Sequence, residues 1–279
     1  LLTLWKIIRS IFIAIPLMKK QSPDVVLAMG SFASFAPVIS AYLLSIPYVI
    51  HEANAVPGRV VSVLSKNAAA VAISFEKTRS FINHKRIIHT GMPLRLGLYH
   101  NLNNYISADS NLFTILVLGG SRGADFLNKE IPKAFTKIKT DNKLFKIIHI
   151  FGFRPIDEIK EAYNKLGITN EVYQFVHNIE DYYKMADLVI CRSGASTCAE
   201  LCLFATPALL IPYPYAVRDH QMLNASILQD HGAADLIDQN DITPTTLSTY
   251  IDNAFNSPNE LRRKATSLKN LSIGDSNKL

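Results

Sequence analysis

The sequence is poor in cysteine and in charge, and each shortage excludes a class of protein. Its 279 residues include only three cysteines, Cys191, Cys198 and Cys202, an odd number with no distant pair. A secreted disulfide framework is therefore not predicted, and the lack of a second cluster argues against a zinc site. We expect reduced thiols. Charged residues make up 19% and hydrophobic residues 48% of the chain, which excludes a disordered protein and allows a sizeable core.

Long hydrophobic runs are also missing. The most apolar segment, residues 1–18, is interrupted by Lys6, Arg9 and Pro16, and it is short for a helix that spans a membrane. No small-residue cleavage site follows it, so a signal peptide is not predicted either. The basic and apolar sides of residues 1–20 indicate a peripheral dock on an anionic membrane surface, and the alternative is a helix packed on a sheet.

Basic residues exceed acidic ones, with a formal net charge of +6 and a pI of about 9.1. Such an excess favours anionic partners: nucleic acid, anionic lipid or phosphorylated substrates. The basic residues are spread along the chain, without an arginine-rich arm or interleaved aromatic residues. Nucleic acid is therefore not predicted as a partner. No cluster of acidic residues indicates a metal site, and no cofactor is predicted.

Apolar runs typical of buried parallel strands alternate with helical segments along the whole chain. We expect strands at residues 24–29, 47–51, 70–74, 86–90, 113–118, 145–151, 172–175, 188–191, 208–211 and 234–237. We expect helices at residues 1–20, 33–44, 58–70, 125–139, 156–166, 179–186, 197–204 and 221–230, and two more to the end. This alternation predicts an α/β fold with two doubly wound domains.

A polar, asparagine-rich segment separates the two halves. It covers residues 99–111 and is interpreted as a linker. The predicted domains are thus residues 1–98 and 112–279, with the last helix a candidate to return to the first domain. In this architecture ligands bind at the carboxyl ends of the strands, in the crevice between domains.

The first motif at such a strand end is Gly119-Gly120-Ser121-Arg122-Gly123. Glycines let a ligand approach the backbone, and the helix N-terminus behind them attracts a phosphate, to which Ser121 could donate. The ordinary alternative is a tight turn between strand and helix. The string also matches G-x-S-x-G, the nucleophile elbow of α/β-hydrolases, but nothing fixes a partner acid or base among Asp187, His220 and His231.

The second motif follows the strand at 188–191 and opens a helix with small residues. Room for a ligand is expected along Arg192-Ser193-Gly194-Ala195-Ser196-Thr197-Cys198-Ala199. Glu200 lies one turn into this helix, and a carboxylate suits a ribose diol because it accepts two hydroxyl hydrogen bonds. The alternative for Glu200 is a capping box with Ser196 or Thr197.

Three weaker candidates are polar residues placed after other strands. Gln221, in the string Asp219-His220-Gln221, is a candidate to hold sugar hydroxyls, although a capped helix start gives the same pattern. Asn54 follows the strand at 47–51 and is placed to meet a ligand. Arg95, near the hinge, is a candidate to neutralise a diphosphate. For each alone, a surface loop residue is the ordinary alternative.

Taken together, these strings resemble the MurG family of glycosyltransferases. The resemblance covers essentially the whole chain and rests on six strings in the family's order: Pro23-Asp24-Val25-Val26, His51-Glu52-Ala53-Asn54, Gly91-Met92-Pro93-Leu94-Arg95, Gly119-Gly120-Ser121-Arg122-Gly123-Ala124, Cys191-Arg192-Ser193-Gly194-Ala195 with Glu200, and Asp219-His220-Gln221. It implies a GT-B-like fold, in which two Rossmann-type domains with parallel sheets face each other across a cleft.

The resemblance also implies an activity. Members move N-acetylglucosamine from UDP-N-acetylglucosamine to a muramyl-pentapeptide on a polyprenyl diphosphate, in peptidoglycan synthesis. They invert the anomeric centre without a metal, as peripheral proteins of the cytoplasmic face of the cell membrane. It implies that Glu200 binds the ribose, Ser121 and Arg95 the phosphates and Val176 the uracil. Residues 195–200 would line the nucleotide site, while Gln221 and Asn54 would meet the sugar.

The sequence departs from the family pattern in its first half. The family's early glycine-rich loop ending in histidine, which includes a candidate general base, is not found here, and residue 1 is not Met. The glycine-rich run after the first strand is reduced to Gly30-Ser31-Phe32-Ala33-Ser34. We therefore expect the chain to begin inside a longer protein, and no catalytic residue is assigned. The alternatives are a nucleotide-sugar-binding module that needs a partner segment, a decayed copy and, less favoured, the hydrolase.

Overall fold

The computed structural model describes residues 2–100, 112–120, 124–138, 144–152 and 157–272. The chain divides into two compact units, the first built from Leu1–Pro93 and the second from Leu94–Asp275. Both contain a parallel sheet, which confirms the predicted α/β class with two parallel-sheet domains. In the described residues no helix is long and apolar enough to cross a membrane.

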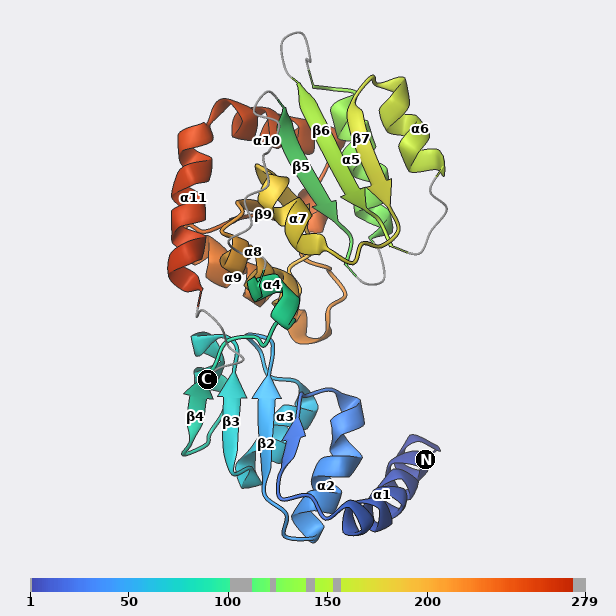
Figure 1. Cartoon of the computed structure of the whole chain (residues 1–279), viewed down its shortest axis with the longest axis vertical. Coiled ribbons are helices and arrows are strands. Elements are labelled where there is room, and N and C mark those ends of the chain that lie inside the picture. Colours follow the sequence, from blue (N-terminus) through green and yellow to red (C-terminus); the bar gives the residue numbers. More distant parts are fainter. Residues whose placement is uncertain (1, 101–111, 121–123, 139–143, 153–156, 273–279) are drawn as a thin grey trace. The chain divides into compact units, whose positions relative to one another are not determined.

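The first unit holds a four-stranded parallel sheet in the order β1-β2-β3-β4 (Figure 1). Its elements are α1 (Leu2–Gln21), β1 (Val26–Ala28), η1 (Phe32–Ser34), α2 (Phe35–Leu43), β2 (Tyr48–Glu52), α3 (Arg59–Leu64), η2 (Ser65–Asn67), β3 (Ala70–Ile73), η3 (Glu76–Phe81) and β4 (Ile87–His89). The central strands β2 and β3 bury Ile50, Val71 and Ile73 against Val38 of α2 and Val61 of α3. The sheet order follows the chain order, so each helical connection returns to the next strand.

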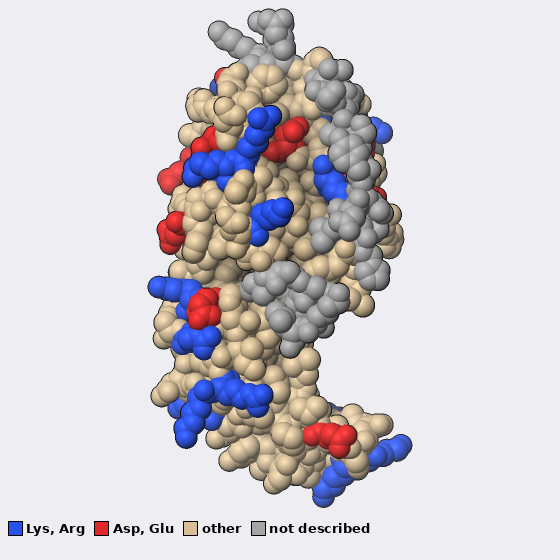
Figure 2. All heavy atoms as spheres, turned by 60° about the vertical axis from the view of Figure 1, so that its left-hand side comes forward, with Lys and Arg blue, Asp and Glu red and all other residues tan. Residues whose placement is uncertain are grey.

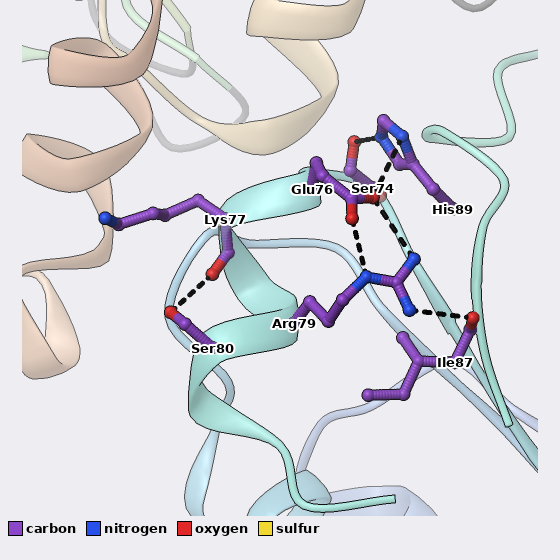
Figure 3. A network of polar contacts seen from close by, with 7 residues as sticks. All are labelled: Ser74, Glu76, Lys77, Arg79, Ser80, Ile87 and His89. Atoms are coloured by element: carbon purple, nitrogen blue, oxygen red, sulfur yellow. Dashed lines mark hydrogen bonds and ion pairs between the residues drawn. The ribbon is translucent and has the colours of Figure 1, made fainter. Parts of the chain in front are cut away.

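A polar network ties η3 to the end of the sheet in this unit (Figure 3). Arg79 bridges two segments: its Nε donates to Glu76 at 2.5 Å and a terminal nitrogen donates to the Ile87 carbonyl at 3.1 Å. His89 lies 3.1 Å from the Ser74 carbonyl through Nε2 and 3.4 Å from Glu76 through Nδ1. These bonds fix the segment that follows β3, which the sequence left without a predicted element.

The second unit holds a six-stranded parallel sheet in the order β10-β9-β8-β5-β6-β7. Its elements are α4 (Leu96–His100), β5 (Phe113–Leu118), α5 (Asp125–Phe135), β6 (Phe145–Ile150), α6 (Asp157–Lys165), β7 (Thr169–Tyr173), α7 (Ile179–Met185), β8 (Leu188–Cys191), α8 (Ala195–Phe204), β9 (Ala208–Leu210), η4 (Val217–Asp219), α9 (His220–Asp230), β10 (Asp235–Leu236), η5 (Gln239–Asp241), α10 (Pro244–Asn256) and α11 (Pro258–Leu271). The strand order reverses between β5 and β8.

Strands β5 and β8 lie at the centre of this sheet because they are apolar on both faces. Ile115, Leu116 and Val117 of β5 are fully buried, as are all four residues of β8. Leu118 of β5 pairs in register with Cys191 of β8, and β8 pairs on its other side with β9. The segments that leave β5, β8 and β9 therefore start side by side at the carboxyl edge of the sheet.

A buried polar network joins β6 to α5 and α6. His149 of β6 is fully buried, with Nδ1 2.9 Å from the Tyr163 hydroxyl and Nε2 3.1 Å from the Asn128 side-chain oxygen. Because that oxygen accepts, Nε2 carries the proton and Nδ1 accepts from Tyr163. The neutral imidazole is therefore satisfied on both sides, and burial lowers the pKa of His149 to about 3.

Element boundaries agree with the sequence where strands are apolar and buried. The predicted strands at 113–118 and 188–191 match β5 and β8 residue for residue. The strand predicted at 172–175 is wrong in position, because β7 covers Thr169–Tyr173. β7 is an edge strand with half-buried polar residues, and such a strand lacks the apolar run that was sought. The short helix α4 was not predicted.

We predict that His149 makes folding of the second unit sensitive to acid. Its pKa is about 3 when folded and about 6.5 in an unfolded chain, so between these values the unfolded state binds more protons. The stability of the neutral, buried imidazole is thus complete above pH 6.5 and is lost as pH falls towards 3. The free energy of unfolding should fall by up to about 1.4 kcal/mol per pH unit in this window.

Urea titrations followed by circular dichroism between pH 4.5 and 7.5 measure this slope. In His149→Gln the slope should be smaller, whereas exposed His231→Gln should keep the wild-type slope. An unchanged slope in His149→Gln would contradict the assignment of the acid sensitivity to this network.

Candidate functional site

The carboxyl edge of the second sheet brings together the segments that the sequence singled out. Gly119 and Gly120 follow β5, Arg192 to Gly194 follow β8, and residues 211–219 follow β9. Neighbouring strands of a sheet lie about 4.8 Å apart, so these three segments are adjacent. This edge is also where the strand order reverses, which is the position at which open α/β sheets bind ligands.

The first of these segments is open to a ligand. Gly120 has φ of 78°, a conformation that side chains disfavour, and an added Cβ would meet no atom of the described residues within 4 Å. Asn128 of the following helix α5 donates to the Phe151 carbonyl at 3.3 Å, which ties α5 to the end of β6. The predicted phosphate ligand Ser121 lies outside the described residues, so its role stays a prediction.

The second segment presents a helix N-terminus. Gly194 is the N-cap of α8 and has no side chain to cap it, so the first-turn N–H groups of Ala195, Ser196 and Thr197 are available to an anion. Ser196 is exposed, and Ala195 and Thr197 are half-buried. Of the other predicted contacts, Ala199 is half-buried and Cys198 is buried. Burial raises the pKa of the Cys198 thiol, which therefore stays protonated and unreactive.

Glu200 lies on α8 one turn beyond this N-terminus. Its Oε2 accepts a hydrogen bond from the Tyr183 hydroxyl at 2.9 Å, and Tyr183 is itself buried and stacked on Phe204 with ring centroids 5.2 Å apart. Among the described residues no other hydrogen bond reaches this carboxylate, so Oε1 remains to accept one. The N-cap of α8 is Gly194, and no side chain caps this helix. The alternative interpretation of Glu200, as part of a capping box, is therefore excluded.

Burial also sets the charge of this carboxyl group. The pKa of Glu200 is raised chiefly by burial, while the Tyr183 hydrogen bond and the charge of Arg95 act in the opposite direction. The predicted phosphate ligand Arg95 is exposed and lies within electrostatic range of Glu200. The structure thus brings together the α8 N-terminus, a carboxylate and a cation. These groups can bind a hydroxyl-bearing anion such as a nucleotide.

The loop between β7 and α7 holds the predicted uracil contact. Val176 is half-buried there, beside Phe175, whose side chain is 58% exposed and packs edge-on against His177 with centroids 5.1 Å apart. Helix α7 then returns to pack on α8. Phe175 is a further candidate for contact with a base, and an aromatic residue next to Val176 in a loop was the signal that could have identified it.

Arg192, which the sequence places along the expected ligand segment, makes its described contacts within the protein. Its guanidinium is buried, 9% exposed as a residue, and donates to the carbonyls of Ile211 and Pro212 at 3.0 Å each and to Gln239 at 2.6 Å. It also lies 5.6 Å from the centroid of the Tyr213 ring. Through these contacts the guanidinium holds the segment after β9. In this structure the guanidinium therefore donates to the protein backbone rather than facing a phosphate site.

Gln221 is held from two sides at the start of α9. Its side-chain oxygen accepts from the Tyr213 N–H at 2.9 Å, and its carbonyl accepts from the Ser193 hydroxyl at 2.8 Å. Asn224, one turn later, is buried and donates to the Ser193 carbonyl at 3.1 Å. The oxygen of the Gln221 amide is engaged, and within the described residues no hydrogen bond uses its NH₂ group. It can therefore donate to a hydroxyl or carbonyl oxygen.

Asn54 lies in the first unit, in a loop built around a buried carboxylate. Glu52, 4% exposed, accepts from the Asn54 N–H at 3.0 Å and from the Gly58 N–H at 2.9 Å. The Asn54 carbonyl accepts from the Thr78 hydroxyl at 3.1 Å. Next to it, buried His51 lies 3.0 Å from the Gly91 carbonyl through Nε2, and burial is the main cause that lowers its pKa. These hydrogen bonds fix the conformation of the loop that carries Asn54.

The structure places Asp187, the acid considered for the hydrolase alternative, away from the loop that would carry the nucleophile. Asp187 accepts from the Thr114 N–H at 2.8 Å, at the amino ends of β5 and β8. The loop that would carry the nucleophile leaves the opposite, carboxyl end of β5. In the part of the chain that the structure describes, no group of three His, Cys, Asp or Glu residues is arranged to hold a metal ion.

Two family models match the chain. The model of the glycosyltransferase family 28 C-terminal domain matches residues 114–278, more than half of the chain, and that of the N-terminal domain matches residues 1–73. The chain belongs to glycosyltransferase family 28. The N-terminal model ends with β3, and the C-terminal model begins within β5, the first strand of the six-stranded sheet.

Curated relatives place the chain within a subgroup of family 28. A protein of Syntrophotalea carbinolica is 35% identical over 96% of this chain and 74% of its own length. A protein of Myxococcus xanthus is 34% identical over 88% of this chain, which spans 64% of that relative's length. Both are named UDP-N-acetylglucosamine–N-acetylmuramyl-(pentapeptide) pyrophosphoryl-undecaprenol N-acetylglucosamine transferase.

Solved structures agree. The crystal structure of Acinetobacter baumannii MurG is 31% identical, with a TM-score of 0.82 over 98% of this chain and 78% of that one. The UDP-GlcNAc 2-epimerase from Neisseria meningitidis, at 14% identity and a TM-score of 0.66, shares the fold alone. These likenesses confirm the predicted MurG family, its GT-B-like fold class and the class of enzyme, a hexosyltransferase.

Proposed function

We propose that this family 28 chain binds UDP-N-acetylglucosamine in its second unit. We further propose that it transfers the N-acetylglucosamine to a lipid-linked N-acetylmuramyl-pentapeptide. The curated relatives are named for this reaction. The observation that carries the proposal here is Glu200, a half-buried carboxylate oriented by Tyr183 beside an uncapped helix N-terminus. That pair suits a ribose diol next to a diphosphate.

The reaction needs stabilisation of the departing UDP. The acceptor's 4-hydroxyl oxygen attacks the anomeric carbon with inversion, the bond to the diphosphate oxygen breaks, and the hydroxyl proton passes to a base. We infer that the leaving diphosphate is stabilised by the N–H groups at the start of α8, by Gly120 and by the cation Arg95. Arg192 is not assigned this role, because its guanidinium donates to carbonyls.

The catalytic base stays unassigned. The second candidate function is therefore a nucleotide-sugar-binding module that needs another segment for turnover. Both candidates require the same UDP site, and transfer of labelled sugar to a lipid-linked acceptor separates them. The hydrolase has no support from the position of Asp187.

The donor site is tested by calorimetric titration of the chain with UDP, with GDP as the control nucleotide. UDP should bind selectively, and Glu200→Ala should weaken it about 10- to 100-fold, because hydrogen bonds to a charged group contribute about 1.5–3 kcal/mol. Glu161→Ala is the matched control, since Glu161 is an exposed carboxylate of the same unit. A folded protein that binds neither nucleotide, or equal affinity in Glu200→Ala, would refute the site.

The positive charge of the chain resides in the first unit. Residues 1–93 contain ten Lys and Arg but only three Asp and Glu, whereas the rest of the chain is nearly balanced. The lower part of Figure 2 shows this excess of basic side chains on the first unit. Helix α1 adds exposed apolar residues, among them Trp5 at 60% and Phe12 at 71%, beside Lys6 and Arg9. We propose that this unit docks peripherally on the anionic, cytoplasmic face of the cell membrane.

Sedimentation with anionic vesicles tests the dock. Binding should fall as salt rises, because screening weakens the attraction of basic residues to anionic lipid. The double variant Trp5→Ser, Phe12→Ser should bind at least about tenfold more weakly, since two large apolar side chains no longer insert. Val63→Ser is the control, because Val63 is a 62% exposed apolar residue of α3. If vesicle binding is unchanged both by added salt and by the double substitution, the membrane dock is excluded.

A further inference from the structure

The segment after β9 carries two exposed tyrosines at the candidate site. Tyr213 is 46% exposed and Tyr215 is 80% exposed, with ring centroids 5.6 Å apart at an angle of 72°. Neither residue was a candidate in the sequence. Single exposed aromatic residues are common on protein surfaces, but these two contact each other and lie on the segment adjacent to the α8 N-terminus.

Tyr213 is held much more firmly than an exposed loop residue needs to be. The buried guanidinium of Arg192 lies 5.6 Å from its ring centroid and at the same time donates to the two preceding carbonyls, those of Ile211 and Pro212. The Tyr213 N–H donates to the side chain of Gln221. The ring, the backbone N–H and the preceding carbonyls are thus all fixed by residues of the candidate site.

The far end of the same segment is also constrained. Arg218 and Asp219 have φ of 56° and 51°, two consecutive left-handed residues that are not glycine. Such backbone costs about 1–3 kcal/mol per residue and persists only where the surroundings over-determine it. His220 then begins α9 with Nδ1 2.8 Å from the Val217 carbonyl. The segment is therefore shaped at both ends rather than left as a loose surface loop.

We propose that Tyr213 is a platform for the pyranose ring of the nucleotide-sugar, and that Arg192 is the residue that positions it. The guanidinium lies over the Tyr213 ring, Tyr215 packs against the ring in a T-shaped contact, and 46% of Tyr213 stays exposed to a ligand. A pyranose presents C–H groups on one face, which suit the negative face of an aromatic ring. The Gln221 NH₂ group, beside Tyr213, supplies a donor for a sugar oxygen. This inference rests on the proposed UDP-sugar site.

The platform predicts a selective loss. A residue that contacts only the sugar contributes to binding of UDP-N-acetylglucosamine and not to binding of UDP. Tyr213→Ala should therefore weaken UDP-N-acetylglucosamine about 5- to 10-fold and leave UDP within about twofold. Tyr213→Phe keeps the ring and should bind both like the wild type. Tyr42→Ala, which removes a 53% exposed tyrosine of the first unit, is the matched control.

A double variant tests whether Arg192 acts through Tyr213. Arg192→Lys keeps the charge but loses the planar fork that reaches two carbonyls, so it should reduce the same selectivity. Because both changes act on one platform, Arg192→Lys combined with Tyr213→Ala should be no worse in selectivity than Tyr213→Ala alone. A merely structural role would lower the melting temperature without changing the ratio of the two affinities.

Calorimetric titration of each variant with UDP and with UDP-N-acetylglucosamine measures the ratio of the two affinities. A Tyr213→Ala variant with an unchanged affinity ratio, or one that weakens UDP and UDP-N-acetylglucosamine equally, overturns the platform while the UDP site stands. Additive losses of selectivity in the double variant overturn the role of Arg192. A wild-type chain that binds no UDP refutes the proposed function and the platform with it.

Discussion

The parallel direction of β5, β8 and β9 is the constraint on which the rest of the second unit depends. Because all three strands run the same way, their carboxyl ends and the helices that follow them open at one edge of the sheet. Register brings Leu118 level with Cys191, so Gly120 and the N-terminus of α8 start beside each other. In the proposed site the N–H groups there attract an anion, and Glu200 lies one turn further along α8.

Charge is distributed to suit different tasks in the two units. The first unit carries the net positive charge together with the exposed apolar residues of α1, a combination suited to a lipid surface. The second unit is nearly neutral, and its two arginines near the site differ in burial. Arg95 is exposed and within range of Glu200, whereas Arg192 is buried among carbonyls and shapes the segment around Tyr213. In the proposed site Arg95 stabilises the leaving diphosphate and Arg192 positions Tyr213.

Sequence patterns identified those features that depend on local chemistry. Apolar runs located β5 and β8, and small residues before Glu200 located the α8 N-terminus.

Sequence patterns did not identify features that depend on contacts between distant parts of the chain. The sequence around Arg192 does not show that its guanidinium donates to backbone carbonyls about twenty residues later. The sequence around Arg95 likewise does not show that this arginine stays exposed. Tyr213 was missed for the same reason, because its support comes from Arg192 and Gln221. β7 was misplaced because edge strands tolerate polar residues. Ser121 lies outside the described residues, and Asn54, in the first unit, keeps its predicted role untested.

The central claim is that Glu200 and the α8 N-terminus form the nucleotide site of this family 28 chain. A crystal structure of the chain with UDP tests it most directly. We expect a ribose hydroxyl within about 3 Å of a Glu200 oxygen, and diphosphate oxygens within about 3 Å of first-turn N–H groups of α8 or of the backbone at Gly120. A UDP molecule bound elsewhere, or one whose ribose is turned away from Glu200, would contradict it.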